Sequence, residues 1–159
     1  MLPTKVNLDA TDILVLRELL TDPRASIADI ARTIGTQRDT VKYRIERMEK
    51  RGLITQYNVI LNPVALGCTI FMQVTISIRP TNNLMKQQFL QELQQHNHVT
   101  HIERTIGPYD YALQMAAIDI TDFDIALNEI KQIGADIITD VQLATIVEGA
   151  KINDFSGLI

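Results

Sequence analysis

Positively charged side chains gather in one short stretch of this chain. Residues 36–52 hold six basic and three acidic residues, although the whole chain carries a formal net charge of −4. Arginine can donate two hydrogen bonds to guanine, glutamine can pair with adenine, and arginine and lysine both attract phosphate. Such residues along one helix are typical of a DNA-binding surface. The residues expected to contact DNA are Gln37, Arg38, Lys42, Tyr43, Arg44, Arg47, Lys50 and Arg51.

Two roles are expected within this set. The first four residues fall in the opening turns of the helix and should face base edges, where hydrogen bonds read sequence. The last four suit phosphate contacts, which position a protein without specifying sequence. The alternative is that several of these charges pair within the helix, as Glu46 and Lys50 can at a spacing of four residues.

A second candidate site is the segment Gly107-Pro108-Tyr109-Asp110. A glycine beside a carboxylate at a sheet edge offers N–H donors for a carboxylate and an acceptor for an ammonium group. These are the two ends of an amino acid, so Gly107, Tyr109 and Asp110 are the expected effector-binding residues. Composition alone favours a plain hairpin turn, for which these residue types need no ligand.

Metal binding and catalysis are not expected. His96, His98 and His101 lie close in sequence, but His98 and His101 should point to opposite faces of a strand. Fewer than three convergent ligands make a poor metal site. Cys68 is the only cysteine, so no intrachain disulfide can form. Nucleophile elbows, phosphate-cradling glycine loops and paired Cys/His sets are all missing, so we predict neither an enzyme nor a cofactor.

A helix-turn-helix should position the basic residues. Apolar residues follow helical spacing on both sides of Gly35 in the stretch Ser26–Gly52. Gly35 suits the turn because it tolerates positive φ, and Thr36 with Asp39 is expected to cap the second helix. A first helix is expected from about Asp9 to Leu20, and the Asp22-Pro23 pair should end it. Its apolar stripe is Leu8, Ile13, Leu16, Leu19 and Leu20, with Asp12 as a polar interruption.

The periodicity changes from 3.6 to 2 after Gly52, which indicates an extended linker strand. Asn62-Pro63 and Gly67 then mark a domain boundary. The predicted division is a helix-turn-helix domain at 1–52, an extended hinge at 53–68, an effector-sensing and oligomerisation domain at 69–148, and a tail at 149–159.

The region 69–148 contains two similar βαβ halves. The expected strands are 69–78, 99–106, 109–117 and 137–147, and the expected helices are 83–96 and one that Thr121 and Asp124 cap and Gly134 ends. The first strand should place Ile70, Met72, Val74, Ile76 and Ile78 on one face and Phe71, Gln73, Thr75 and Ser77 on the other. The second helix should bury Phe123, Leu127, Ile130 and Ile133. This order predicts an α+β, ferredoxin-like βαββαβ domain with both helices on one face of an antiparallel sheet. The uncovered face would be buried most simply in a homodimer. A tolerated solvent-facing sheet is the alternative.

Charge separates the two parts of the chain. Residues 1–60 have ten basic and eight acidic residues, whereas residues 61–159 have five basic and eleven acidic ones. Only the first module should therefore meet phosphate. No apolar run approaches the length of a membrane span and no signal-peptide pattern begins the chain, so we expect a cytoplasmic protein that does not bind membranes.

The chain resembles the Lrp/AsnC (feast/famine) family of transcriptional regulators over nearly its whole length. The resembling residues are Leu8-Asp9, Asp12, Ile13, Leu16, Arg24, Ser26, Ile30-Ala31, Gly35, Val41, Arg44-Ile45, Met48, Gly52, Ile54, Tyr57, Leu61, Asn62-Pro63, Leu66-Gly67, Gly107 and Tyr109-Asp110-Tyr111. Thr36 stands where the family usually has serine, and residues 134–145 match less well.

The resemblance implies a winged helix-turn-helix joined to a ferredoxin-like (RAM-type) regulatory domain. It also implies dimers that assemble into octamers, and a small effector, commonly an amino acid, bound between dimers. A twofold dimer would read a pseudo-palindromic site on double-stranded DNA.

Two other functions fit the same two-domain plan. Tetrapyrrole (siroheme-type) decarboxylases share it without acting on DNA, and a histidine could serve them as an acid. A stand-alone metabolite-sensing oligomer would also lack DNA binding. The dense basic helix argues against the decarboxylase.

Overall fold

The computed structural model describes residues 6–148, which fall into two compact units that divide after residue 60. The predicted tail at 149–159 lies outside the described residues. Each unit has its own hydrophobic core. In the part of the chain that is described, no helix is both long and apolar enough to span a membrane.

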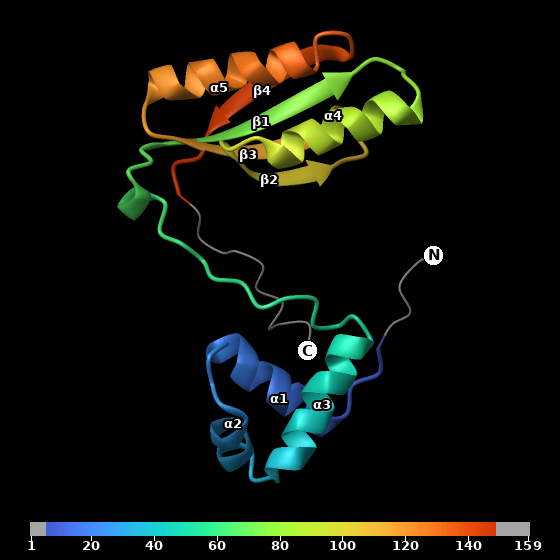
Figure 1. The fold of residues 1–159 in the computed structure, drawn as a ribbon, viewed down its shortest axis with the longest axis vertical. Helices are drawn as coiled ribbons and strands as arrows, with labels where there is room; N and C mark the ends of the chain where they lie inside the picture. The colour runs from blue at the N-terminus through green and yellow to red at the C-terminus, as the bar shows by residue number, and fades with distance from the viewer. Residues whose placement is uncertain (1–5, 149–159) are drawn as a thin grey trace. The chain divides into compact units, whose positions relative to one another are not determined.

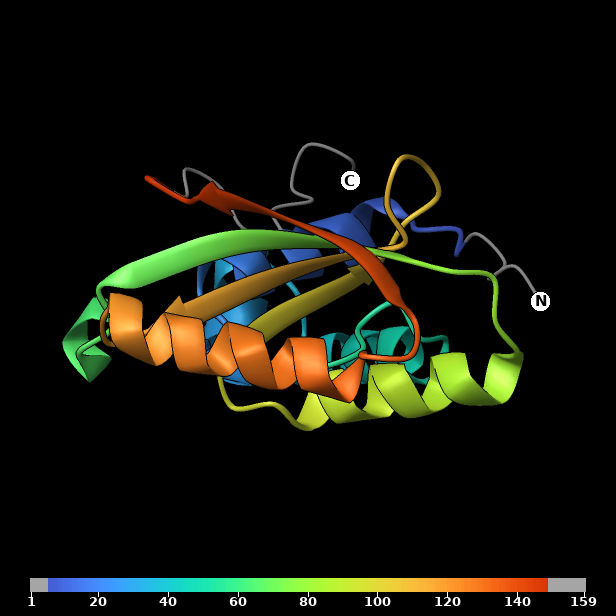
Figure 2. The same cartoon turned by 90° about the horizontal axis from the view of Figure 1, so that it is seen from above.

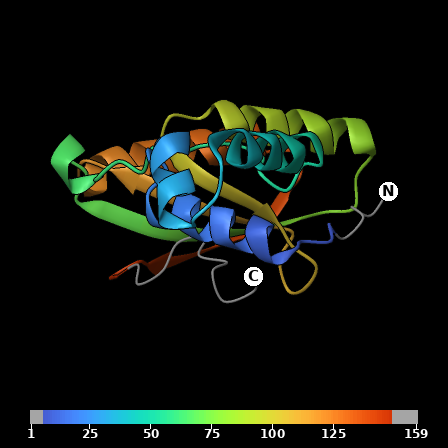
Figure 3. The ribbon, with the colours of Figure 1, turned by 90° about the horizontal axis from the view of Figure 1, so that it is seen from below.

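The N-terminal unit consists of three helices, α1 (Ala10–Thr21), α2 (Ile27–Thr33) and α3 (Arg38–Lys50). Figures 1 and 3 show the short turn that joins α2 to α3, with α1 packed beside them. This confirms the predicted helix-turn-helix and its preceding helix. The buried residues of its core are Val15, Leu16, Ile30, Ala31, Val41 and Met48. The sequence reading missed Val15, and it wrongly placed Leu20 on the buried stripe, since Leu20 is exposed.

The helix ends show where local signals succeed and fail. Asp9 caps α1 in a reciprocal capping box with Asp12, and Gly35 ends α2 with the expected positive φ of 70°. The predicted Thr36–Asp39 box at α3 is wrong. The N-cap of α3 is Gln37, which makes no side-chain cap bond. Thr36 is not the cap because it belongs to the preceding turn, where its N–H donates to the carbonyl of Ala31 (2.9 Å).

The predicted linker strand does not form. Residues 55–62 have no hydrogen-bonded strand partner in the described chain, although their sequence alternates. Alternation describes one face of a strand, but a strand also needs a neighbour for its backbone groups. Val59, Ile60 and Leu61 are consequently exposed. A short 3₁₀ turn, η1 (Val64–Leu66), follows and ends at Gly67 with a φ of 91°.

The C-terminal unit is the predicted ferredoxin-like domain. Its elements in chain order are β1 (Ile70–Ile78), α4 (Asn83–Gln95), β2 (Val99–Arg104), β3 (Tyr111–Ala117), α5 (Ile120–Ile133) and β4 (Ile138–Thr145). The sheet order is β2-β3-β1-β4, and all neighbouring strands are antiparallel. Figure 2 shows α4 and α5 on the same face of this sheet.

The core of this domain lies between the sheet and the two helices. Val74 and Ile76 of β1 are fully buried there, together with Phe89 and Leu93 of α4. The other face of β1, with Phe71, Gln73, Thr75 and Ser77, receives no helix. Alternation along β1 therefore sorts its residues as the sequence predicted.

Three details of this domain were predicted wrongly. Asp119, not Thr121, caps α5 and accepts a hydrogen bond from the Asp122 N–H, because the helix starts earlier than the Thr-Asp pair suggested. Ile133 is 37% exposed although it was expected to be buried. The strands β2 and β3 stop short of the turn, so residues 105–110 form a longer loop.

Candidate nucleic-acid interface and effector loop

The basic residues of α3 fall into two groups in the structure. Arg38 and Lys42 near its start, and Lys50 and Arg51 at its end, are exposed. None of these four forms an ion pair within the described chain. Gln37 and Tyr43 are exposed as well, and Tyr43 reaches 60% exposure. These six predicted DNA contacts are therefore open to a ligand.

Arg44 and Arg47 are instead paired with α1. Their guanidinium groups converge on Asp12, whose side chain is fully buried. Arg44 Nη1 lies 3.0 Å from Asp12 Oδ1, while Arg47 pairs with the second oxygen. Arg44 also bonds Asp9, and this hydrogen bond is the main reason that the pKa of Asp9 is lowered and that of Arg44 is raised. The two arginines thus hold α3 against α1.

This ion-pair network was not foreseen from the sequence. The sequence shows Asp12 only as an interruption of an apolar stripe, and it predicts that both arginines contact phosphate. The signal was present, because a buried carboxylate requires cationic partners and α3 supplies two arginines three residues apart on one face. The alternative interpretation expected charges to pair within α3, as Glu46 could with Lys50. The observed ion pairs of Arg44 and Arg47 instead join α3 to α1.

The three predicted effector residues all lie in the loop 105–110. Its base is closed by hydrogen bonds from the Thr105 N–H to the Asp110 carbonyl (2.9 Å) and from the Thr105 hydroxyl to the Tyr109 carbonyl (2.6 Å). Asp110 also fastens the loop to β1, since its Oδ2 accepts from the Ile78 N–H (2.8 Å). Gly107 is exposed at the tip, and a Cβ added there would meet nothing within 4 Å. The loop thus combines a fixed base with an open tip.

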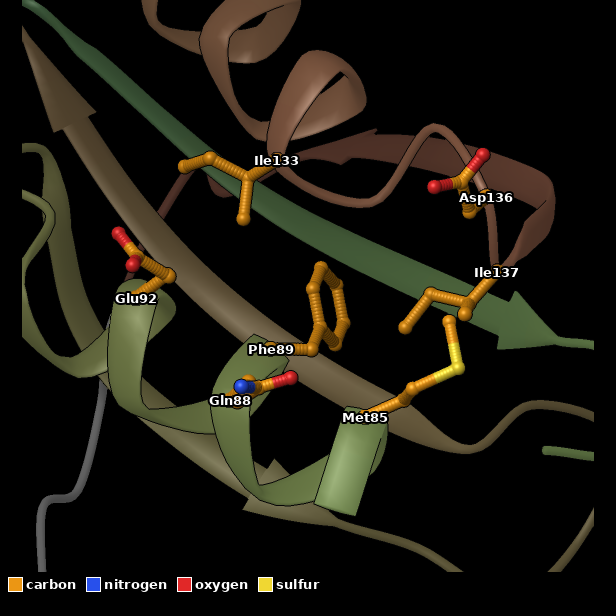
Figure 4. Close-up of a pocket in the computed structure, with 7 residues that line it drawn as sticks. All are labelled: Met85, Gln88, Phe89, Glu92, Ile133, Asp136 and Ile137. Atoms are coloured by element: carbon orange, nitrogen blue, oxygen red, sulfur yellow. The ribbon is translucent and has the colours of Figure 1, made fainter. Parts of the chain in front are cut away.

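A groove of about 500 Å³ lies between α4 and the end of α5 (Figure 4). Phe89 forms its centre, with Met85, Ile133 and Ile137 as apolar neighbours. Glu92 and Asp136 lie on opposite sides of the Phe89 ring, and both are exposed. The exposure of Ile133, which the sequence did not predict, opens this groove.

Each histidine of the cluster has its own carboxylate neighbour. His96 Nε2 lies 3.2 Å from Glu129 Oε2, and His98 Nε2 lies 3.1 Å from Asp122. The pKa of Asp122 is lowered chiefly by the Ile118 N–H and further by His98. His98 precedes β2, so the predicted strand alternation does not apply to it. Within residues 6–148, no three or more His, Cys, Asp or Glu side chains gather as a metal site would require.

Comparison with known proteins now adds to this geometry. Residues 8–55 match a family model described as winged helix-turn-helix DNA-binding. Residues 71–152 match one described as the Lrp/AsnC ligand binding domain. The two matches together cover both units of the fold.

Similar individual proteins are also regulators. A proline dehydrogenase transcriptional activator of Rhodobacter capsulatus is 30% identical over 77% of this chain and 79% of its own. A leucine-responsive regulatory protein of Haemophilus influenzae is 27% identical over 73% of this chain and 70% of its own. A transcriptional regulator from Neisseria meningitidis, solved in complex with L-Met, shares the fold with a TM-score of 0.82 and 20% identity, covering 92% of this chain and 94% of its own.

Proposed function

This chain belongs to the Lrp/AsnC family of transcriptional regulators. We propose that it binds specific DNA sequences through α3 and that binding of a small amino acid changes its DNA affinity. DNA binding is assigned to residues 1–52 and effector sensing to residues 69–148, with 53–68 as a hinge. The observation that carries the proposal is the row of exposed, unpaired cations on α3.

The structure's two groups of cations suggest a division of labour on DNA. Gln37, Arg38, Lys42 and Tyr43 are proposed to face base edges in the major groove. Lys50 and Arg51 are proposed to contact phosphates. Arg44 and Arg47 remain in the proposed interface, but their main task is to hold α3 against α1, because each donates to the buried Asp12 carboxylate.

The effector is proposed to bind at Gly107, Tyr109 and Asp110. Asp110 uses only Oδ2 to hold β1, which leaves Oδ1 to accept from an ammonium group. The exposed backbone around Gly107 can donate to a carboxylate. An amino acid is the favoured class because one relative is named leucine-responsive and a structure of the same fold holds L-Met.

Self-association completes the proposal. The face of β1 that carries Phe71 receives no helix, and pairing it with a second copy would bury it. Such twofold dimers, and octamers built from them, would place two α3 helices on pseudo-palindromic half-sites about one DNA turn apart. A regulator of this kind works where DNA is, so we place it in the cytoplasm.

The experiment is a DNA-binding titration with the protein's own upstream DNA at two salt concentrations, repeated with each of the twenty amino acids. The slope of log affinity against log salt should fall by about one in Lys50→Gln, which removes a proposed phosphate contact, and stay unchanged in the matched Lys131→Gln variant. An effector should move the midpoint by about tenfold, equivalent to about 1.4 kcal/mol of coupling. Equal slopes in both variants would contradict the α3 assignment, and twenty inactive amino acids would contradict the effector class.

A further inference from the structure

The side of α4 that faces β2 borders a second pocket, of about 300 Å³, distinct from the groove in Figure 4. Asn83, Lys86, Gln87 and Leu90 line it from α4. Arg104 contributes from the last position of β2, and Tyr111 from the first position of β3. Arg104 and Tyr111 are direct partners in the β2–β3 register, so their side chains share one face of the sheet.

Tyr111 gives the pocket a hydroxyl group that has no protein partner in the described chain. Its side chain packs edge-on against Phe89, with ring centroids 5.7 Å apart, and the residue is only 3% exposed. The hydroxyl makes no hydrogen bond within the described chain. No described side-chain oxygen or nitrogen is both enclosed and unpaired, so the hydroxyl must be accessible, and the pocket gives it that access. Burial raises the pKa of Tyr111 despite the nearby Arg104 charge, so the hydroxyl remains a donor at neutral pH.

The Asp110 carboxylate and Arg104 both act on this hydroxyl, but the charged side chains that line the pocket itself are both positive, in a domain that is otherwise acidic. Residues 61–148 contain ten acidic residues and only four cations, namely Arg79, Lys86, Arg104 and Lys131. Two of these four cations, Lys86 and Arg104, line the pocket beside Tyr111. Neither Lys86 nor Arg104 forms an ion pair with any described carboxylate. The pocket therefore presents two cations, a tyrosine hydroxyl and two side-chain amides, with Leu90 as an apolar wall.

We propose that this pocket, formed by Lys86, Arg104 and Tyr111 with Asn83 and Gln87, binds a small organic anion through a carboxylate or phosphate group. The planar guanidinium of Arg104 can donate two parallel hydrogen bonds to either group, while Lys86 adds a point charge. The Tyr111 hydroxyl and the amides supply neutral donors. None of these side chains has a hydrogen-bond or ion-pair partner within the described chain, so their donors are available to a small anion in the pocket.

This anion site is separate from the proposed amino-acid site but adjoins it. Arg104 and Tyr111 flank the loop 105–110 on either side, and the Thr105–Asp110 hydrogen bond closes that loop beside them. An anion held by both residues would brace the base of the loop. The proposed anion site does not depend on DNA binding or on an amino-acid effector, so it can be tested independently of the proposed function.

The test is calorimetric titration of the full chain, without DNA, using succinate and inorganic phosphate at constant ionic strength. Saturable binding of either probe is expected, and comparing the two tells whether carboxylate or phosphate is preferred. Arg104→Gln and Lys86→Gln should each weaken it about tenfold, as expected for a charged hydrogen bond. Tyr111→Phe keeps the packing against Phe89 and should weaken binding by a smaller factor.

Lys131→Gln is the matched control, because it removes the same charge from α5 without touching the pocket. Circular dichroism of each variant shows that the fold is kept. The proposal is overturned if neither probe saturates on the wild-type chain. It is also overturned if Lys131→Gln weakens binding as much as Arg104→Gln, since the effect would then be one of net charge alone.

Discussion

Asp12 determines which partners Arg44 and Arg47 bind within the protein. It is fully buried in α1, yet it faces two arginines that arise more than thirty residues later in α3. A buried carboxylate is tolerated only with such partners. Arg44 and Arg47 satisfy it, so part of their hydrogen-bonding capacity is used within the protein, which the composition of α3 alone does not show.

Replacing Asp12 with asparagine should therefore destabilise the N-terminal unit by about 1.5–3 kcal/mol, because charge-assisted hydrogen bonds to both arginines are lost. Urea unfolding with hydrogen exchange read separately for each unit measures the change. Asp39→Asn makes the same chemical change at an exposed position and should have a much smaller effect. Equal destabilisation by the two variants would refute the role given to Asp12.

The exposure of a candidate site residue could be predicted where it depended only on the residue's position along its own helix. Gln37, Arg38 and Lys42 lie early on α3 and away from its apolar stripe, and the structure exposes them. The sequence could not show that Asp12 would claim Arg44 and Arg47, because that contact depends on how α1 crosses α3. The Lys86–Arg104–Tyr111 pocket was likewise invisible, since its residues come from three elements.

At the scale of elements, two hydroxyl residues that each come just before a helix differ in whether they cap it. Ser26 caps α2 by accepting from the Asp29 N–H at 3.1 Å, whereas Thr36 caps nothing. Ser26→Ala should cost about 1 kcal/mol of stability, and Thr36→Ala should stay within about 0.5 kcal/mol. Thermal unfolding of both variants checks this. A larger loss for Thr36→Ala would restore the capping box that the sequence suggested.

Two glycines of the C-terminal domain should respond oppositely to alanine. A Cβ at Gly134 would lie 2.3 Å from Ile138 and 2.8 Å from the Phe89 ring, so Gly134→Ala should destabilise the domain by about 1–3 kcal/mol. Gly107→Ala meets no atom within 4 Å and should be nearly neutral. Urea midpoints and hydrogen exchange in α5 and β4 report the difference. Similar losses in both variants would contradict the packing described around Gly134.

The order and type of the main elements followed from periodicity, because both domains bury one face of each helix and strand. Residues 70–78 alternate and form β1, and residues 83–95 repeat helically and form α4. Periodicity failed at residues 53–61, where alternation exists without a strand partner. It also failed at strand ends, because the length of the loop 105–110 depends on hydrogen bonds to β1.

For the molecule as a whole, the separation of charge matches the separation of units. The N-terminal unit carries the exposed cations of α3, while the C-terminal unit is acidic apart from a few cations. A net negative protein can thus bind a polyanion, provided that only one module meets it. Counts of basic and acidic residues before and after residue 60 predicted this separation of charge. The two family models match residues 8–55 and 71–152, one on each side of that division.

The measurement that tests this account most directly is DNA affinity after charge reversal on α3. The double variant Arg38→Glu, Lys42→Glu should lose nearly all measurable binding to its own upstream DNA, because two attractive contacts become repulsive. The double variant Arg79→Glu, Lys131→Glu changes the net charge equally in the C-terminal unit and should bind as the wild type does. Unchanged affinity in the α3 variant, for every duplex tried, would contradict the assignment of DNA binding to this helix.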